Sequence, residues 1–101
     1  MSEKLGTNLQ EKEEVKVKRP KMYNVILLND DYTTFDFVVK VLVSFFNKSF
    51  IEAEKIAMEI HQNKKGICGT FPKNVAEMKS KKTNQYSKSN QFPLKSIVEA
   101  V

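Results

Sequence analysis

Hydrophobic residues form both short continuous runs and longer helical repeats along this chain. Residues 22–28 are almost uninterrupted in apolar and aromatic side chains, which predicts a strand at the centre of a sheet or buried on both faces. From Phe35 to Phe46 the apolar residues recur at three- and four-residue steps, which predicts a helix with a wide apolar stripe. Thr33 and Asp36 have the spacing of a capping box, so we expect this helix to begin directly after Thr33.

A second capping box, formed by Ser49 and Glu52, predicts another helix that continues to about Lys64. The apolar face of this helix consists of Ala53, Ile56, Ala57 and Ile60. The stretch 66–71 is short, apolar and bounded by glycine, and it predicts a second strand.

A third helix is expected to begin at Pro72, because proline suits the first turn of a helix. Its apolar positions are Val75, Ala76, Met78 and Tyr86. A final strand is predicted over residues 94–101. The resulting order, β-α-α-β-α-β without an internal repeat, implies an α+β fold in which three helices pack on a small sheet.

The length of 101 residues leaves room for one small domain. Residues 1–21 are polar, so we predict a flexible N-terminal arm, followed by a single folded domain over residues 22–101. The chain has no apolar stretch near the roughly 20 residues that span a bilayer, and residues 1–21 lack the apolar segment of a secretory signal. We therefore expect a cytoplasmic protein with no membrane partner.

The net charge of +5 includes only one arginine, Arg19, and acidic residues are interspersed among the lysines. Nucleic-acid binders usually gather basic and aromatic residues on one face, so we expect no nucleic-acid partner. Residues 79–88 are locally rich in lysine. A solvated helix face is the simpler interpretation of that segment, and a docking surface for an acidic partner is the alternative.

Few residues suggest catalysis. Cys68 is the only cysteine and His61 the only histidine, which excludes a disulfide framework and a tetrahedral zinc site of those residues. Cys68 lies in an apolar strand pattern, whereas a reactive thiol needs a positive and partly exposed setting. Asp30 and Asp31 are explained by a turn between strand and helix. We therefore expect no enzyme, no metal and no cofactor.

A polar recognition cleft is the remaining chemical possibility. The segment 29–34 supplies one amide, two carboxylates and two threonine hydroxyls where a strand ends and a helix begins. His61 falls near the carboxyl end of the second helix, at the edge of its apolar face. From these residues alone, a capped turn and a structural histidine are the simpler interpretations, and a binding cleft is the alternative.

The sequence resembles the ClpS family of adaptors of the Clp protease. The most specific signal is the run Asn-Asp-Asp-Tyr-Thr at residues 29–33, which lies within a longer similar stretch, 22–38. Residues 53–61, 66–69 and 75–79 and the pair Pro93-Leu94 follow in the order and spacing of the family. The likeness covers about residues 20–101.

The resemblance implies an adaptor rather than an enzyme. Members of this family capture substrates that carry an N-degron, which is a free α-amine on a large hydrophobic first residue. They deliver these substrates to a Clp-family AAA+ unfoldase, ClpA-like, and its ClpP-type peptidase. The family fold has three antiparallel strands backed by three helices, in agreement with the pattern above. The resemblance also implies a bacterial cytoplasmic protein, and nothing in the sequence demands more than a monomer.

The resemblance also assigns roles to individual positions. The positions that match the family's acceptors for the substrate α-amine are Asn29, Asp30 and His61. Those that match its hydrophobic pocket are Thr33, Phe35, Val38, Ala57, Ile60 and Leu94. Those that match its unfoldase-docking surface are Asn74, Glu77 and Lys79.

Three positions depart from the family's usual residues. The family often has Met where this chain has Phe35 and Ala57, so we expect Ala57 to enlarge the pocket and Phe35 to refill part of it. Asn74 replaces a frequent acidic residue on the docking surface. The alternative function is a generic protein-interaction domain that binds an acidic partner through its lysine-rich third helix.

Overall fold

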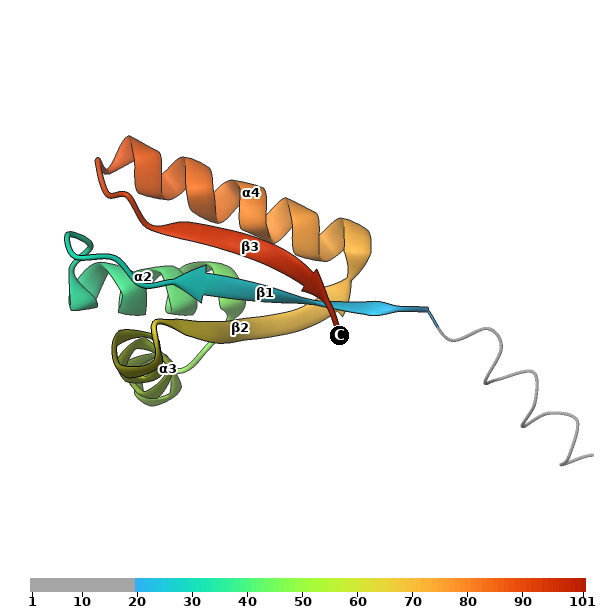
Figure 1. Cartoon of the computed structure of the whole chain (residues 1–101), viewed down its shortest axis with the longest axis horizontal. Coiled ribbons are helices and arrows are strands. Elements are labelled where there is room, and N and C mark those ends of the chain that lie inside the picture. The colour runs from blue at the N-terminus through green and yellow to red at the C-terminus, as the bar shows by residue number, and fades with distance from the viewer. Residues whose placement is uncertain (1–19) are drawn as a thin grey trace, which may run out of the picture.

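Six elements follow one another in the order that the sequence predicts. The computed structural model describes residues 20–101, so the arm predicted for residues 1–21 lies almost entirely outside the described residues. The elements are β1 (Met22–Leu28), α2 (Phe35–Phe46), α3 (Phe50–Asn63), β2 (Lys65–Pro72), α4 (Lys73–Ser89) and β3 (Lys95–Ala100), as Figure 1 shows. The predicted α+β class is confirmed.

β1 is the central strand of a three-stranded sheet with the order β2-β1-β3, and both of its pairings are antiparallel. A central strand has a neighbour on each side that shields its side chains, which suits the almost continuously apolar sequence of β1. Its register with β2 shifts between Val25 and Ile26, where Val25 pairs with Gly69 and Ile26 with Ile67. Cys68 is therefore the extra residue of a β-bulge.

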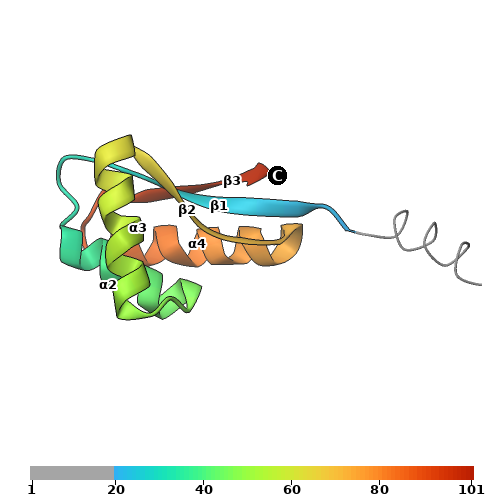
Figure 2. The same cartoon turned by 90° about the horizontal axis from the view of Figure 1, so that it is seen from below.

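The helices lie on one side of the sheet, as the view in Figure 2 shows for α2 and α4. Val25 and Leu27 of β1 point to this side and belong to the core. The core also contains apolar residues from α2, α3, α4 and β2: Phe37, Val38, Val39, Val41, Leu42, Phe46, Ala53, Ala57, Ile60, Cys68 and Ala76, with Leu94 before β3. Within residues 20–101, no helix is long and apolar enough to cross a membrane.

The predicted start of α2 was wrong by one residue. The N-cap is Thr34, whose hydroxyl accepts a hydrogen bond of 3.2 Å from the backbone N–H of Phe37. Thr33 is not free for this role, because its hydroxyl and its backbone N–H both donate to the carboxylate of Asp30. The capping box of Ser49 and Glu52 at the start of α3 is confirmed.

α4 packs on the core through small polar residues as well as through two of the predicted apolar positions, Ala76 and Tyr86. Met78 is 48% exposed, whereas Ser80, Thr83 and Ser87 are buried beside Ala76. The buried hydroxyls are paired: the oxygens of Ser80 and Ser96 are 2.6 Å apart. Thr83 and Ser87 each donate to the carbonyl four residues earlier. Helical periodicity of apolar residues does not reveal such a face.

Candidate functional site

A cleft of about 450 Å³ opens where β1 leads into α2, beside the carboxyl end of α3. This is the left-hand end of the molecule in Figure 1. The residues that line the cleft come from two stretches of the chain: Asn29, Asp30, Asp31, Thr33, Phe35 and Val38 from the first, and Ala57, Met58, Ile60 and His61 from the second. The structure thus brings the 29–34 loop and the end of α3 together, as a binding cleft requires.

Asp30 shapes the loop that forms one wall of this cleft. Its Oδ1 accepts hydrogen bonds from the backbone N–H groups of Tyr32 (2.8 Å) and Thr33 (2.7 Å), and its Oδ2 accepts one from the Thr33 hydroxyl (2.7 Å). Partial burial raises the pKa of Asp30, but these hydrogen bonds outweigh it and hold the pKa below its ordinary value. Asp30 therefore stays ionised and keeps the loop in place.

Asn29 and His61 supply uncommitted polar groups. The backbone N–H of Asn29 donates to the carbonyl of Lys64 (2.8 Å), which ties the loop to the end of α3. Within residues 20–101, no hydrogen bond engages the carboxamide of Asn29 or the imidazole of His61. Both side chains line the cleft. Their oxygen and nitrogen lone pairs are available to a ligand that donates hydrogen bonds.

The apolar part of the cleft is built from α2 and α3. Val38, Ala57 and Ile60 are almost fully buried, and Phe35 is partly exposed at the edge. Gly66 positions this wall, because a Cβ at that residue would lie 2.7 Å from Cγ1 of Ile60. The absence of a side chain at Gly66 therefore lets β2 approach α3 closely. The result is a small apolar surface directly beside the polar groups.

The lining differs from the sequence prediction at three positions. Leu94, which was expected in the pocket, is buried in the core and is not among the residues that line the cleft. Asp31 and Met58 do line it: Asp31 was expected only as one of the carboxylates of the 29–34 loop, and Met58 was not expected at all. Met58 follows Ala57, one position off the buried stripe of α3. Only its place beside a predicted pocket residue could have suggested a role at the cleft edge.

Cys68 does not join the cleft. It lies in the core, and burial raises the pKa of its thiol to about 12, against the smaller opposing effects of a hydrogen bond with the Leu27 backbone and the charge of Lys48. A thiol with this pKa is not ionised near neutral pH, as the sequence pattern suggested. In the described part of the chain, no group of three or more His, Cys, Asp or Glu residues is placed to hold a metal ion.

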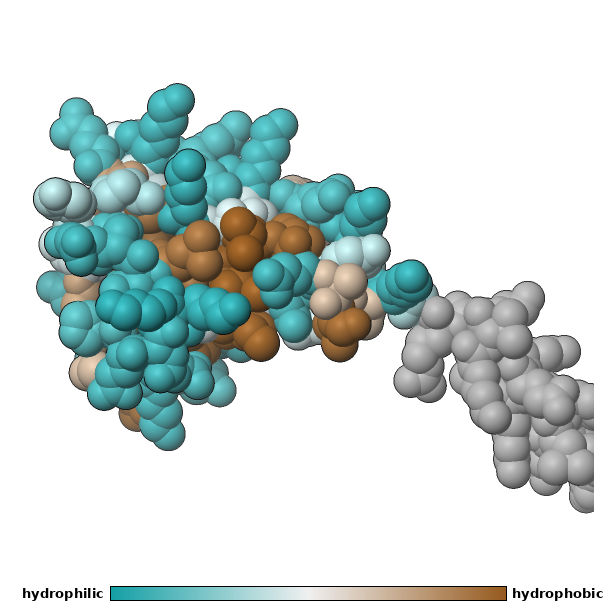
Figure 3. Space-filling view, in the orientation of Figure 1, coloured by the Kyte–Doolittle hydropathy of each residue, from teal (hydrophilic) through white to brown (hydrophobic). Residues whose placement is uncertain are grey.

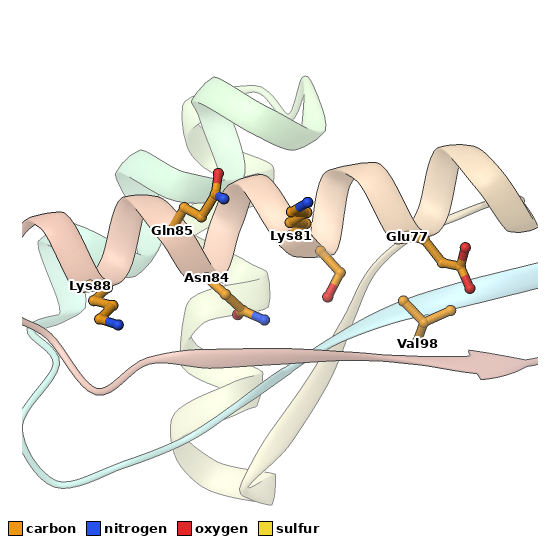
Figure 4. A pocket seen from close by; sticks show the side chains of 7 residues that line it. Glu77, Lys81, Asn84, Gln85, Lys88 and Val98 are labelled. Atoms are coloured by element: carbon orange, nitrogen blue, oxygen red, sulfur yellow. The ribbon is translucent and has the colours of Figure 1, made fainter.

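A second hollow, of about 420 Å³, lies between α4 and β3 (Figure 4) and is more open to solvent than the cleft. Figure 4 shows Asn84 and Lys88 pointing from α4 toward β3. Asn84 is already engaged: its carboxamide accepts from the backbone N–H of Ser96 (2.7 Å) and donates to the Ser96 carbonyl (3.2 Å). Lys81 and Lys88 contribute the positive charge at this hollow.

The three residues expected on a docking surface lie in the first two turns of α4, at the end of the molecule opposite to the cleft (Figure 1). Asn74 and Glu77 are exposed. Lys79 is half-buried: its Nζ donates to the carbonyl of Phe45 (2.8 Å) and lies 5.3 Å from the ring centre of Phe71. Lys79 therefore has a structural role whatever else it contacts.

Taken together, the fold and the cleft define a small α+β binding domain, with acceptor groups and an apolar wall at one end. Residues 18–97 match the sequence profile of the family described as ATP-dependent Clp protease adaptor protein ClpS. The match covers most of the chain, so this protein belongs to the ClpS family of Clp protease adaptors.

Individual relatives agree with this assignment. The chain is 45% identical over 96 residues to the ClpS adapter protein of Vibrio atlanticus, covering 95% of this chain and 91% of that protein. It is 50% identical over 84 residues to the ClpS adapter protein of Bdellovibrio bacteriovorus, covering 83% and 74%. Among solved structures, Agrobacterium tumefaciens ClpS2 bound to L-phenylalaninamide superimposes with a TM-score of 0.80 at 35% identity, covering 82% of this chain and all of that one.

Proposed function

We propose that this protein binds N-degrons in the cleft between the 29–34 loop and α3 and delivers their carriers to a Clp unfoldase and peptidase. The observation that carries the proposal is the adjacency, in one cleft, of uncommitted acceptors on Asn29 and His61 and an apolar wall. The ligand named for Agrobacterium tumefaciens ClpS2, L-phenylalaninamide, has the matching chemistry: a free α-amine beside an aromatic side chain.

The α-ammonium group of the ligand is the hydrogen-bond donor in this proposal. It donates to the side-chain oxygen of Asn29 and to the imidazole of His61, which accepts only through an unprotonated ring nitrogen. The carboxylate oxygens of Asp30 already accept hydrogen bonds from the loop, so we assign Asp30 a positioning role. Its negative charge also attracts the α-ammonium group, directly or through a bridging water. Asp31 adds a second negative charge to the same cleft.

The first side chain of the substrate fills the apolar part of the cleft. Val38, Ala57 and Ile60 form its inner wall and Phe35 its edge. Burying a Phe or Leu side chain stabilises the complex by about 1.5–3 kcal/mol, which alone gives only weak binding. Contacts to the amine must therefore supply much of the affinity and most of the selectivity for a chain terminus.

The remaining elements of the proposal concern delivery. Asn74 and Glu77 at the start of α4, with Lys79 beside them, form the surface that we assign to a ClpA-like AAA+ unfoldase. We assign the cleft of a single copy of the chain as the binding unit. We propose that the protein acts in the bacterial cytoplasm as an adaptor, without chemistry or a cofactor of its own.

The experiment that tests the binding proposal compares two peptides that differ only at the first nitrogen. A fluorescent peptide with a free N-terminal Phe is titrated against its N-acetyl twin. Acetylation removes the charge and two donors and leaves Asn29 and His61 unpaired, so we expect affinity to fall at least about a hundredfold. Asn29→Ala and His61→Ala should each abolish the preference, whereas Lys88→Ala on α4 serves as the control. Equal binding of the two peptides would refute the proposal.

A second candidate function rests on the lysines at the hollow between α4 and β3. There the protein would bind an acidic partner through α4 and have no preference for a free amine. The double variant Lys81→Glu/Lys88→Glu would abolish such binding, and Asn29→Ala would leave it intact. The two candidates therefore predict opposite responses to the same pair of variants.

A further inference from the structure

The face of the sheet that points away from the helices is open among the described residues. Alternation along β1 sends Val25 and Leu27 into the helix-side core and Ile26 to the opposite face, and Ile26 is not a member of that core. Figure 2 shows α2 and α4 on one side of the sheet only. Figure 3 views the other side, where apolar residues gather at the middle of the molecule with hydrophilic residues around them.

Three isoleucines form a row across this open face. Ile26 pairs with Ile67 on β2 and with Ile97 on β3, so the three side chains lie next to one another at right angles to the strands. Ile67 is 51% exposed and Ile97 38%, whereas Ile26 between them is only 5% exposed. The outer two shield the middle one but remain exposed themselves. A contiguous apolar patch of this kind is typical of an interaction surface.

Charges of opposite sign flank the isoleucine row at equal spacing. Two residues before Ile97 on β3 is Lys95, and two residues after it is Glu99, and both are exposed. Because side chains on a strand alternate between faces, both belong to the open face. The lysine side of the row also contains Lys65, which pairs with Leu28. On the glutamate side, Thr70 donates to Asn24 across the strands (2.6 Å).

This layout is self-complementary under one particular two-fold rotation. If the axis runs along the isoleucine row, the row of one copy lies on the row of the other, and Lys95 of each copy lies over Glu99 of the other. If the axis instead runs along the strands, Lys65 of one copy lies over Lys95 of the other, which is repulsive. A two-fold interface repeats each contact, so the first arrangement gains two ion pairs and the second gains two like-charge contacts.

We propose that two copies of this chain associate face to face through the open side of the sheet, with the isoleucine rows in contact and Lys95 of each paired with Glu99 of the other. In this dimer α4 of each copy faces outward, and the two clefts lie at opposite ends, so each keeps its access to ligand. The apolar row is small beside the roughly 1,200–2,000 Å² that standard interfaces bury, so the association is weak and depends on concentration.

Sedimentation equilibrium of the full chain, from low micromolar to the highest soluble concentration, tests the proposal. We expect reversible dimers. Ile97→Lys, at a partly exposed position, should remove them while N-terminal Phe peptide binding stays unchanged. Glu99→Lys and Lys95→Glu should each weaken the dimer by about tenfold or more, since each places like charges opposite one another. Glu54→Lys, in the hollow between α2 and α3, is the matched control and should have no effect.

The charge-swapped double variant Lys95→Glu/Glu99→Lys is the decisive measurement. It restores opposite charges across the interface, so we expect its dimer affinity to return to within about threefold of the unmodified chain. An unspecific apolar association would not show this recovery. A chain that stays monomeric at all concentrations, or a dimer that is insensitive to Ile97→Lys, overturns the proposal and leaves the peptide-binding function untouched.

Discussion

Asp30 shows how a single side chain both shapes and charges a binding cleft. Its two oxygens accept three hydrogen bonds from Tyr32 and Thr33, which fix the turn between β1 and α2. The same bonds lower its pKa against the opposing effect of burial, so the negative charge persists at all pH values at which the protein is expected to work. A substitution of Asp30 therefore changes both the conformation of this turn and the charge of the cleft.

The first prediction concerns Asp30 and has a defined pH dependence. Because the folded-state pKa lies below the ordinary value, the stabilisation by Asp30 is present above about pH 4 and is lost as the pH falls further. Asp30→Ala should therefore lower both the free energy of unfolding and peptide affinity at pH 7, and its effect on unfolding should shrink near pH 3. Urea unfolding at the two pH values measures this. Asp31→Asn, which leaves the turn intact, should reduce affinity but not stability.

Ala57 determines how much room the apolar part of the cleft has. It is almost fully buried in the cleft wall and carries only a methyl group. Ala57→Met would insert a longer side chain into this space. We expect affinity for peptides with a first Trp or Phe to fall by about tenfold or more, and affinity for a first Leu to fall less. Fluorescence anisotropy with the three peptides measures the ratio, and a uniform loss for all three would contradict this account of the pocket.

At the scale of elements, α4 is joined to β3 by polar groups rather than by an apolar ridge. The carboxamide of Asn84 bonds both the N–H and the C=O of Ser96, as a neighbouring strand would. The Ser96 hydroxyl oxygen lies 3.1 Å from both the Asn84 side-chain oxygen and the Ser80 carbonyl oxygen, so its single hydrogen is shared between these two acceptors. These groups are partly or fully buried and mutually satisfied, so the loss of one partner leaves the other unpaired.

Asn84→Ala should therefore destabilise the fold more than a typical helix-surface substitution. We expect a loss of about 1–3 kcal/mol in the free energy of unfolding, because the backbone groups of Ser96 lose their partners. Gln85→Ala, on the next residue of the same helix, is the control and should change stability by less than about 0.5 kcal/mol. Equal effects of the two substitutions in urea unfolding would show that the Asn84 bonds contribute nothing.

The sequence predicted the elements well and their surfaces less well, for physical reasons. Periodicity and the Ser49–Glu52 capping box were sufficient for the order of elements and for the start of α3. The start of α2 was misplaced because two adjacent threonines have similar capping ability, and only the Asp30 bonds decide between them. On α4, Ala76 and Tyr86 were predicted to face the core and do so, but the buried hydroxyl residues were missed, because they do not count toward an apolar pattern even when each has a partner in the fold.

The cleft could be predicted only in part, because it joins residues that are distant in sequence. Local patterns placed the 29–34 loop and His61 but did not bring them together. The resemblance to the ClpS family supplied that connection, and the structure places all of the predicted amine-binding residues in one cleft. Leu94, assigned by the same resemblance, is not among the residues that line the cleft. Asp31 belongs to the same loop motif, but only the path of the loop in the structure shows that it lines the cleft.

At the scale of the whole molecule, ligand binding and docking are assigned to opposite ends. The cleft lies where β1 meets α2, and Asn74 and Glu77 lie at the start of α4, beyond the far end of β2 (Figure 1). The paired strands and the buried core connect the two ends. An adaptor that is built in this way can hold a substrate and contact the unfoldase at the same time.

The last prediction separates these two activities. Glu77→Lys reverses an exposed charge on the proposed docking surface, and it is preferable to Lys79→Ala because Lys79 also bonds the carbonyl of Phe45 and supports the fold. We expect Glu77→Lys to slow degradation of a substrate with an N-terminal Phe by about tenfold in the presence of a ClpA-like unfoldase and its peptidase. Peptide affinity should stay unchanged. His61→Ala should have the opposite effect: it should abolish peptide binding. If Glu77→Lys reduces peptide affinity instead, the two ends are coupled and the assignment of separate surfaces is wrong.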